Sequence, residues 1–398
     1  MTKLMFIFWS AAIVIPSPCR SECEFVTTFQ EPFYEGELSE GRLYLVNPST
    51  TDITVEVDTP LIGRTPLAVL NLDAKEQTSV TIPYSLLCNA SGYSNKGIRI
   101  RSDDDIVVQA ISLSAFGTSS WEVPPIEKLG RIHVLMTPVY ATVPTNQGSY
   151  QILVVAPSAG TTVEVELNGP WDYRVEFDGI NYNNSDMIYI ELRQYQVAQI
   201  QCQQNDGCDM SGTVVISNRP VYVTSGTLSR SSLATSRLSN VISYVPPAER
   251  AGKEYIFTFA GVVKIFGTMF ENETSVSISK PIGNTLIQES IHFAFQCKHY
   301  SVSASYCLIV DKPVLVSYLP EATSQENPNS FFLFLDAVDH RRSSDYTFAT
   351  MDSLFGSCTY HLKLQVPTPA ISGILIDERH GPWEWQALEI GEHFCRGK

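Results

Sequence analysis

The sequence predicts an all-β protein, a β-propeller of about seven four-stranded blades. Short alternating runs of Val, Ile, Tyr and Thr recur throughout, such as RLYLVNPSTTDITVEV and SGTVVISNRPVYVTSG, and Gly, Pro, Asn, Asp or Ser separates them. Alternation with a period of two between turn-forming residues is typical of strands. The runs also return along the chain as an internal repeat, while helical periodicity is hard to find in any segment.

The chain opens with a stretch typical of a secretory signal peptide. A lysine gives a positive start, residues 4–15 form an apolar core, and Cys19 and Ser21 are the small residues that precede a cleavage point. We expect residues 1–21 to be removed and residues 22–398 to form one mature domain that is secreted. No later segment has the ~18 consecutive apolar residues that a membrane span requires.

The cysteines agree with an extracellular address. Of the nine, Cys19 leaves with the signal peptide, and an even number remains for disulfides in an oxidising compartment. Short separations favour the pairs Cys202–Cys208 and Cys297–Cys307. The weaker remaining pairs are Cys23–Cys88 and Cys358–Cys395.

Three glycosylation sequons indicate the same compartment, at Asn89, Asn183 and Asn272. The formal net charge is −15, and no basic stripe is present, so nucleic acid is excluded as a partner class. The same acidity disfavours anionic membrane surfaces and acidic polymers.

A superrepeat of about 115 residues occurs three times, and an incomplete fourth copy begins near residue 345. Two strand patterns alternate within it, and a VPP segment joins successive copies. The first pattern lies at 98–112, 213–226 and 305–319; the second lies at 44–57, 152–166 and 267–279; the joints lie at 123–134 and 245–256.

Each superrepeat divides into two halves of about four strands, each centred on what we interpret as a hairpin. Four strands in 40–55 residues, repeated about seven times, is the pattern of a propeller, because stacked blades cover one another's faces. The alternative is a set of three tandem β-sandwiches of about 115 residues. The absence of Pro/Gly/Ser-rich linkers at the joints favours the propeller.

Three consecutive aspartates, Asp103–Asp105, could belong either to a calcium site or to a tight turn. The alignment of the repeats places SDDD opposite SNRP and VDKP, so basic residues occupy matching positions. Asp and Asn suit turns because their side chains hydrogen-bond the local backbone. We therefore interpret this segment as a corner between strands.

The segments CEFVTTFQEPF, KGIRIRSDDDIVVQAISLSA and WEVPPIEKLGRIHVLMTPVYA, in this order, resemble the amino-terminal domain of the IgG Fc-binding protein family. The Ser217–Val223 segment matches a later part of its pattern. Trp121, Glu122 and Pro125 depart from it, and His133 stands where the family has an aromatic residue. The resemblance implies a secreted, non-enzymatic protein of mucus, extracellular matrix or surface defence. No residue set for antibody binding can be mapped onto this chain.

Motifs that carry chemistry are absent from the sequence. No H-E-x-x-H, no G-x-S-x-G and no sialidase box occurs, so we expect no catalytic residue, no metal and no cofactor. Glu164 and Glu166 share one face of a strand, where a solvated rim is the simplest explanation. Paired aromatic residues have binding potential and could contact a ligand, or could pack between blades: Trp171, Tyr173, Trp383 and Trp385.

The function that these observations favour is recognition of extracellular glycoproteins, mucin-like polymers or microbial glycans. The alternative is a secreted hydrolase that uses rim carboxylates. That alternative predicts a central cluster of Asp, Glu, Arg and Tyr with a perturbed pKa. A matrix scaffold without a discrete ligand is a third hypothesis.

Overall fold

Strands and short connections make up the described part of the chain. The computed structural model describes residues 22–30, 40–114, 117–137, 150–169, 173–202, 208–227, 241–257, 261–267, 273–279, 285–291, 297–302, 306–320 and 333–338. Short 3₁₀ helices are η1 (Tyr84–Leu86), η2 (Ile126–Lys128) and η3 (Ala248–Arg250). In these residues, no helix is long and apolar enough to span a membrane.

The strands fall into three groups along the sequence. The first repeat contains β1 (Cys23–Thr27), β2 (Phe29–Gln30), β3 (Glu40–Val46), β4 (Ile53–Asp58), β5 (Ala68–Leu72), β6 (Gln77–Ile82), β7 (Leu87–Cys88), β8 (Gly92–Ser94), β9 (Ile98–Ser102), β10 (Val107–Ser114) and β11 (Gly117–Glu122). The second contains β12 (Gly130–Val134), β13 (Tyr150–Val155), β14 (Thr161–Glu166), β15 (Arg174–Phe177), β16 (Ile180–Asn183), β17 (Met187–Leu192), β18 (Val197–Cys202), β19 (Val214–Thr227) and β20 (Val241–Tyr244). The third contains β21 (Gly252–Phe257), β22 (Gly261–Gly267), β23 (Thr274–Ser279), β24 (Thr285–Ile291), β25 (Cys297–Val302), β26 (Tyr306–Pro320) and β27 (Leu333–Leu335).

The three repeats share one plan of strand pairing. In the first repeat, one sheet has the order β1-β9-β4-β5 and the other has the order β11-β10-β3-β6. In the second repeat β12, β14 and β17 take the places of β1, β4 and β5, while β20, β13 and β18 take those of β11, β3 and β6. The third repeat follows with β21, β23 and β24 in one sheet and β27, β22 and β25 in the other.

A single strand crosses between the two sheets of the second repeat and of the third. The first part of β19 pairs with β14, and its last part pairs with β13. Strand β26 divides in the same way between β23 and β22. In the first repeat two separate strands take these places: β9 pairs with β4 in one sheet, and β10 pairs with β3 in the other. The aspartate segment lies between them. The aspartates therefore mark a corner from one sheet to the other, and the segment does not turn back as a hairpin.

The two sheets of a repeat face each other over their own apolar core. In the first repeat Val55 and Val57 of one sheet and Leu43 and Leu45 of the other belong to one buried cluster. Along β4 these side chains alternate with polar ones, as two facing sheets require. Along β3 they alternate with Tyr44 and Val46, which belong to a separate buried cluster. Equivalent buried clusters fill the second and third repeats.

The prediction of a seven-bladed propeller is not confirmed by the described residues. It expected each blade to be formed by consecutive strands, whereas the strands of each repeat interleave between two facing sheets, and β19 and β26 belong to both. The two segments interpreted as hairpins both cross from sheet to sheet. The alternative, three tandem β-sandwich repeats, describes the pairing; the expected fourth copy lies outside the described residues.

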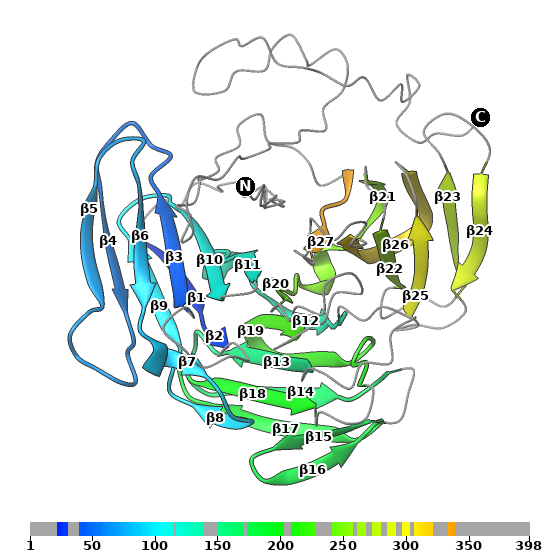
Figure 1. Ribbon diagram of the computed structural model, residues 1–398, viewed down its shortest axis with the longest axis horizontal. Coiled ribbons are helices and arrows are strands. Elements are labelled where there is room, and N and C mark those ends of the chain that lie inside the picture. The colour runs from blue at the N-terminus through cyan, green and yellow to red at the C-terminus, as the bar shows by residue number, and fades with distance from the viewer. Residues whose placement is uncertain are drawn as a thin grey trace, which may run out of the picture.

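The repeats follow one another around an arc, with β11, β20 and β27 on its inner side (Figure 1). The first two repeats share a continuous core, because Tyr222 and Ile242 of the second pack into the cluster of the first. Strand β8 also leaves the first repeat to pair with β18. Residues far apart in the sequence therefore meet on the inner side of the arc.

Candidate functional site

Three equivalent positions of the repeat carry polar side chains on the inner side of the arc. Glu122 ends β11, Tyr244 ends β20, and Asp336 follows β27. Each position comes directly before a fully buried small residue, either a valine or an alanine. Because the pairing plan is the same in each repeat, these three side chains converge. Glu122 interacts electrostatically with both of the others.

Two basic residues complete this group, which we call the inner cluster: Glu122, Lys128, Tyr244, Arg250 and Asp336. Lys128 ends η2 and Arg250 ends η3, at matching positions of the VPPIEK and VPPAER joints. The proline before each helix has an extended backbone, which sets the helix against the neighbouring repeat.

Arg250 links the second repeat to the third. Its Nη2 atom lies 2.5 Å from Oδ1 of Asp336, and both side chains keep about a third of their surface exposed. Burial lowers the pKa of the Arg250 guanidinium, whereas the negative charges of Asp336 and Glu122 raise it. The net effect is a raised pKa. Ligand groups therefore have access to this ion pair.

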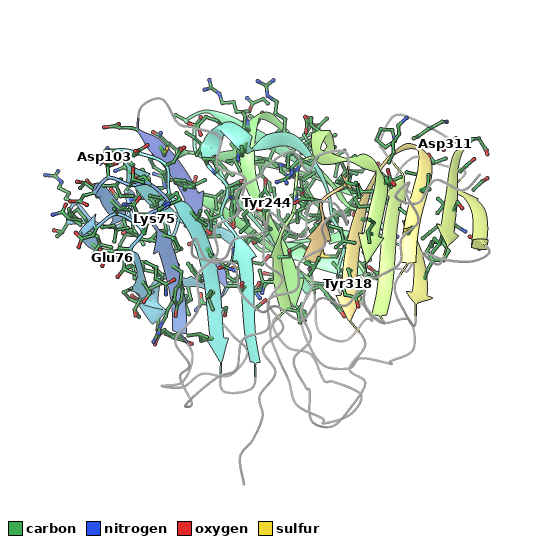
Figure 2. The ribbon with its side chains drawn as sticks, turned by 90° about the horizontal axis from the view of Figure 1, so that it is seen from above. Lys75, Glu76, Asp103, Tyr244, Asp311 and Tyr318 are labelled. Atoms are coloured by element: carbon green, nitrogen blue, oxygen red, sulfur yellow. A yellow bond between two sulfur atoms is a disulfide. The ribbon has the colours of Figure 1, made fainter. Side chains whose placement is uncertain are left out.

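Tyr244 forms the aromatic base of the inner cluster. Its ring stacks on that of Tyr222, with centroids 5.3 Å apart and an interplanar angle of 16°. The buried hydroxyl of Tyr244 has no hydrogen-bond partner among the described residues, and Glu122 and Arg250 are the charged groups that act on it most strongly. Figure 2 shows Tyr244 between the first and third repeats.

Tyr222 is anchored in place by both of its neighbours. Its hydroxyl accepts a hydrogen bond from Oγ1 of Thr27 at 3.3 Å and donates to the carbonyl oxygen of Glu122 at 3.4 Å. Full burial raises the pKa of this phenol. The fixed ring of Tyr222 in turn sets the orientation of Tyr244.

The carboxyl group of Glu122 titrates near neutrality. Burial raises its pKa from 4.5 to about 7; Arg250 and Lys128 oppose the rise, and Asp336 adds to it. Burial also lowers the pKa of Lys128, and Glu122 partly offsets that effect. The inner cluster therefore offers hydrogen-bond donors, acceptors and a carboxyl group that can act as either.

The hydrolase alternative predicted a central cluster of Asp, Glu, Arg and Tyr with a perturbed pKa, and the inner cluster has this composition. In the described residues, no group of three or more His, Cys, Asp or Glu side chains is arranged to hold a metal ion. The groups of the inner cluster that reach solvent are the guanidinium of Arg250 and the carboxyl of Asp336, a hydrogen-bond donor and an acceptor.

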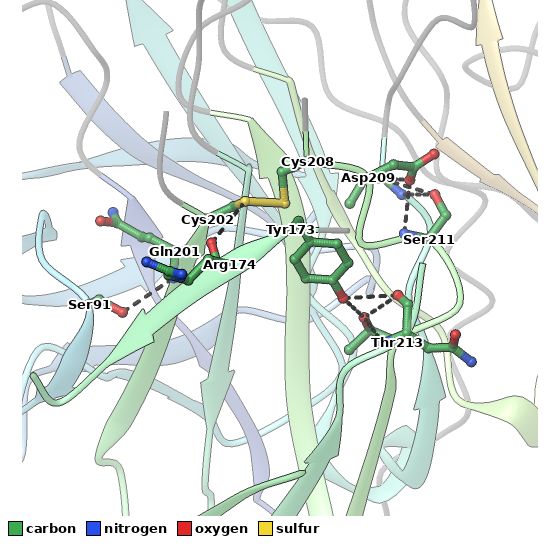
Figure 3. The surroundings of a disulfide bond; sticks show 11 residues. Ser91, Tyr173, Arg174, Gln201, Cys202, Cys208, Asp209, Ser211 and Thr213 are labelled. Atoms are coloured by element: carbon green, nitrogen blue, oxygen red, sulfur yellow. Dashed lines mark hydrogen bonds between the residues drawn. A yellow bond between two sulfur atoms is a disulfide. The ribbon is translucent and has the colours of Figure 1, made fainter. Parts of the chain in front are cut away.

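The predicted ligand-contacting aromatic Tyr173 belongs to the core instead. Only 4% of it is exposed, and its hydroxyl bonds the carbonyl oxygen of Asn168 at 3.0 Å and Oγ1 of Thr213 at 3.2 Å. Burial raises its pKa to about 12. Figure 3 shows these bonds beside the Cys202–Cys208 disulfide. Trp171, Trp383 and Trp385 lie outside the described residues.

The cysteines follow the prediction in one pair and depart from it in another. Cys202 and Cys208 form a disulfide that connects the end of β18 to the segment before β19, with Cα atoms 6.4 Å apart. Cys88 is a free, buried thiol, so the predicted Cys23–Cys88 pair is wrong. Cys23 and Cys307 are disulfide-bonded. The described side chains do not include Cys297, Cys358 or Cys395.

The sequons lie on the surface where the structure describes them. Asn89 follows β7, and Asn183 ends β16; both are exposed. Asn272 lies outside the described residues. Exposure is what attachment of a glycan requires, and glycosylation itself stays a prediction.

Sequence analysis missed the residues of the inner cluster, although it found the joints that carry them. The matching VPPIEKLG and VPPAERAG segments already placed Lys128 and Arg250 at one position of the repeat. Glu122 had been noted only as a departure from the family pattern. The missing information was which strands lie on the inner side, because the sequence does not show that the ends of β11, β20 and β27 come together.

Comparison with known proteins identifies relatives of this chain. The profile of the IgGFc binding protein family matches residues 119–394. The human IgGFc-binding protein is 30% identical over 157 residues, which are 39% of this chain and 3% of that protein. The chain thus spans a small fraction of the length of this relative. A solved biofilm-associated protein BSP domain is 7% identical, with a TM-score of 0.15, covering 80% of this chain and 63% of that one.

Proposed function

Because the chain belongs to the IgGFc binding protein family, we propose that it is a secreted, non-enzymatic recognition module that binds extracellular glycoproteins, mucin-like polymers or microbial glycans. Residues 22–398 form the secreted module in this proposal. The expected signal peptide, the disulfides and the exposed Asn89 and Asn183 support the extracellular setting.

The observation that carries the proposal is the composition of the inner cluster. Carbohydrates present many hydroxyl groups and apolar ring faces, so they are bound by carboxylates and guanidinium groups beside an aromatic ring. The inner cluster supplies Glu122, Arg250 and Asp336 around Tyr244, whose hydroxyl has no partner among the described residues. We propose that a glycan or the glycosylated part of a protein contacts the partly exposed Arg250 and Asp336, and that the buried hydroxyl of Tyr244 becomes accessible to it on binding.

Binding assays on the mature chain test the proposal. We expect it to retain glycans on an array or mucin from mucus. Tyr244→Phe, which removes one hydroxyl, is expected to weaken that binding about five-fold. Tyr173→Phe is the matched control, because that hydroxyl is buried in the core away from the inner cluster. A folded protein that retains no glycan and no glycoprotein would overturn the proposal.

The name of the human relative describes binding of the Fc part of immunoglobulin G. Immunoglobulin Fc is therefore included as a ligand beside mucin and glycans. Binding that survives removal of the Fc glycan, and is unaffected by Tyr244→Phe, would assign recognition to protein surface elsewhere on the chain.

The second candidate function is hydrolysis, and one observation favours it. Glu122 and Asp336 lie in one cluster with different environments, and the pKa of Glu122 is about 7, which suits a general acid or base. Turnover of a glycoside or ester by the mature chain, abolished by Glu122→Gln, would establish this function. Binding without turnover would leave recognition as the function.

A further inference from the structure

We propose that the exposed face of β14 and β17, centred on Tyr189, binds an extended basic segment of a partner protein. This surface, which we call the Tyr189 face, consists of three residues from each strand: Thr162, Glu164 and Glu166 of β14, and Met187, Tyr189 and Glu191 of β17. It is distinct from the inner cluster and does not depend on it.

Strand geometry fixes which side chains point outward. Tyr189 lies opposite Glu164 in the antiparallel register, and Glu191 lies opposite Thr162. The intervening residues of both strands face the core of the second repeat, where Ile188 and Ile190 are buried. Tyr189 consequently stands outward with 71% of its surface exposed, which makes it the most exposed of the large apolar side chains in the described residues.

Comparison with the first repeat shows that the charge of this face is not neutralised. In the first repeat Glu56 lies opposite Arg101 of β9 and forms an ion pair of 2.9 Å with it. Asp58, one step along, lies opposite Arg99 and is paired with it in the same way. The first repeat thus balances each carboxylate with an arginine on the neighbouring strand.

The second repeat lacks these arginines. The residues opposite Glu164 and Glu166 on β19 are Ile216 and Val214. Among the described residues, no ion pair involves Glu164, Glu166 or Glu191. The same position of the same fold therefore presents three carboxylates without a counter-charge, which a basic partner would complement.

The spacing of the carboxylates selects the shape of that partner. Glu164 and Glu166 are two residues apart on a strand, so their side chains repeat every ~7 Å. An extended segment with Arg or Lys at alternate positions has the same period. Tyr189 lies between the carboxylates and would accept a cation on its ring face.

The position of β17 also allows such a segment to dock. In the described residues β17 pairs with β14 alone, so the outward side chains of these two strands form one continuous surface at the end of the sheet, and a segment can lie across it. A second copy of this chain is a poor occupant, because the net charge of −15 makes two copies repel each other. The charge and the spacing together favour a basic protein segment.

The experiment measures binding of a synthetic peptide to the mature chain by fluorescence anisotropy. The probe is about ten residues long and alternates Arg with Thr; a second peptide has Glu in place of Arg. We expect the basic peptide alone to bind, with affinity falling steeply as salt rises. The triple variant E164Q/E166Q/E191Q is expected to weaken binding about ten-fold, and Tyr189→Ala about three-fold.

The matched control is Glu56→Gln in the first repeat, which removes a carboxylate that is already paired and should leave binding unchanged. The glutamate and Tyr189 substitutions are on exposed or half-exposed positions, and circular dichroism checks that each variant is folded. Unchanged binding by the triple variant would overturn the proposal. Equal competition by spermine would reject the extended segment as the occupant. Loss of binding in Tyr244→Phe alone would assign the peptide to the inner cluster.

Discussion

The carboxylate of Asp103 accepts a hydrogen bond from the backbone N–H of Thr54, with a distance of 2.8 Å between Oδ1 and the nitrogen. Asp103 lies at the corner between β9 and β10, and Thr54 is the second residue of β4. The bond therefore joins the place where the chain changes sheets to the start of the neighbouring strand.

The other repeats contain the same bond. Oδ1 of Asn218 accepts from the N–H of Thr162 at 2.9 Å, and Oδ1 of Asp311 accepts from the N–H of Ser275 at 2.7 Å. Asp103 and Asp311 lie at opposite ends of the molecule, both in the upper part of the view in Figure 2. Since the neutral amide of Asn218 serves as well as a carboxylate, the corner requires an acceptor oxygen and not a negative charge.

Replacing Asp103 by alanine should destabilise the protein by about 1–2 kcal/mol, because the N–H of Thr54 loses its acceptor. Asp103→Asn should be nearly neutral, as Asn218 already shows. Urea denaturation measures both. Asp104→Ala is the control, since that side chain bonds only the adjacent N–H of Asp105.

Adding calcium or a chelator should leave the melting temperature unchanged, because Oδ1 of Asp103 already accepts from the N–H of Thr54, and the neutral side chain of Asn218 makes the equivalent bond. A rise in melting temperature with calcium that Asp103→Asn removes would instead assign a cation to this segment.

The stability of the protein should fall as pH rises through the range from about 4.5 to 7, because of Glu122. Its folded-state pKa is above that of the unfolded chain, so its contribution is complete at low pH and is lost as the carboxyl ionises. Glu122→Gln should remove this dependence and stabilise the protein at pH 8 by about 1–3 kcal/mol. At pH 4, where Glu122 is protonated, the two proteins should unfold at nearly the same urea concentration.

His133 should produce the opposite dependence. It is fully buried, and Nδ1 lies 2.9 Å from the carbonyl oxygen of Val245. Burial lowers its pKa below 6.5, although contacts with Val245 and Gly130 work against that effect. Its contribution is thus present above about pH 6.5 and lost as pH falls and the ring is protonated.

The equivalent positions of the other repeats suggest the test variant. Phe25 lies opposite Pro125, and His133 lies opposite Pro247, the equivalent proline of the next joint. His133→Phe therefore introduces the residue that the first repeat has at this position. The variant should lose the destabilisation below pH 6.5 in thermal melts. At pH 8 it should be about 1 kcal/mol less stable, because one of the two carbonyls that face the ring, that of Val245 or that of Gly130, loses a donor.

Cys88 should react with a thiol reagent only after denaturation. It is 1% exposed, and burial raises the pKa of its thiol, so the reactive thiolate is both rare and inaccessible in the folded protein. Peptide mass mapping after alkylation, without reduction, would locate the label. Labelling of Cys88 in native buffer, or a disulfide to it, would contradict the structure.

The repeat and the strand content could be predicted from the sequence, because alternation and self-similarity are local properties. The corner at Asp103 was also correctly placed. The path of the chain at this corner was not predicted, since a polar break between two strands has the same sequence pattern in both cases. The chain can reverse within one sheet or pass to a facing sheet. That distinction depends on partners such as Thr54, which are distant in the sequence.

The inner cluster could not be predicted for a related reason. Glu122, Tyr244 and Asp336 share a position in the repeat but no chemistry, so an alignment gives no sign that they meet. For Tyr173 the sequence left ligand contact and packing both open. The structure places it in the core, with its hydroxyl next to that of Thr213.

Strands β19 and β26 have a consequence for how the molecule comes apart. A sheet that shares a strand with the facing sheet cannot unfold alone, because unfolding of the shared strand breaks backbone hydrogen bonds in both sheets. The second and third repeats should each melt as one cooperative unit, with amide protons of both layers exchanging together. The first repeat has a break at Asp103–Asp105 instead, so partial opening would begin there.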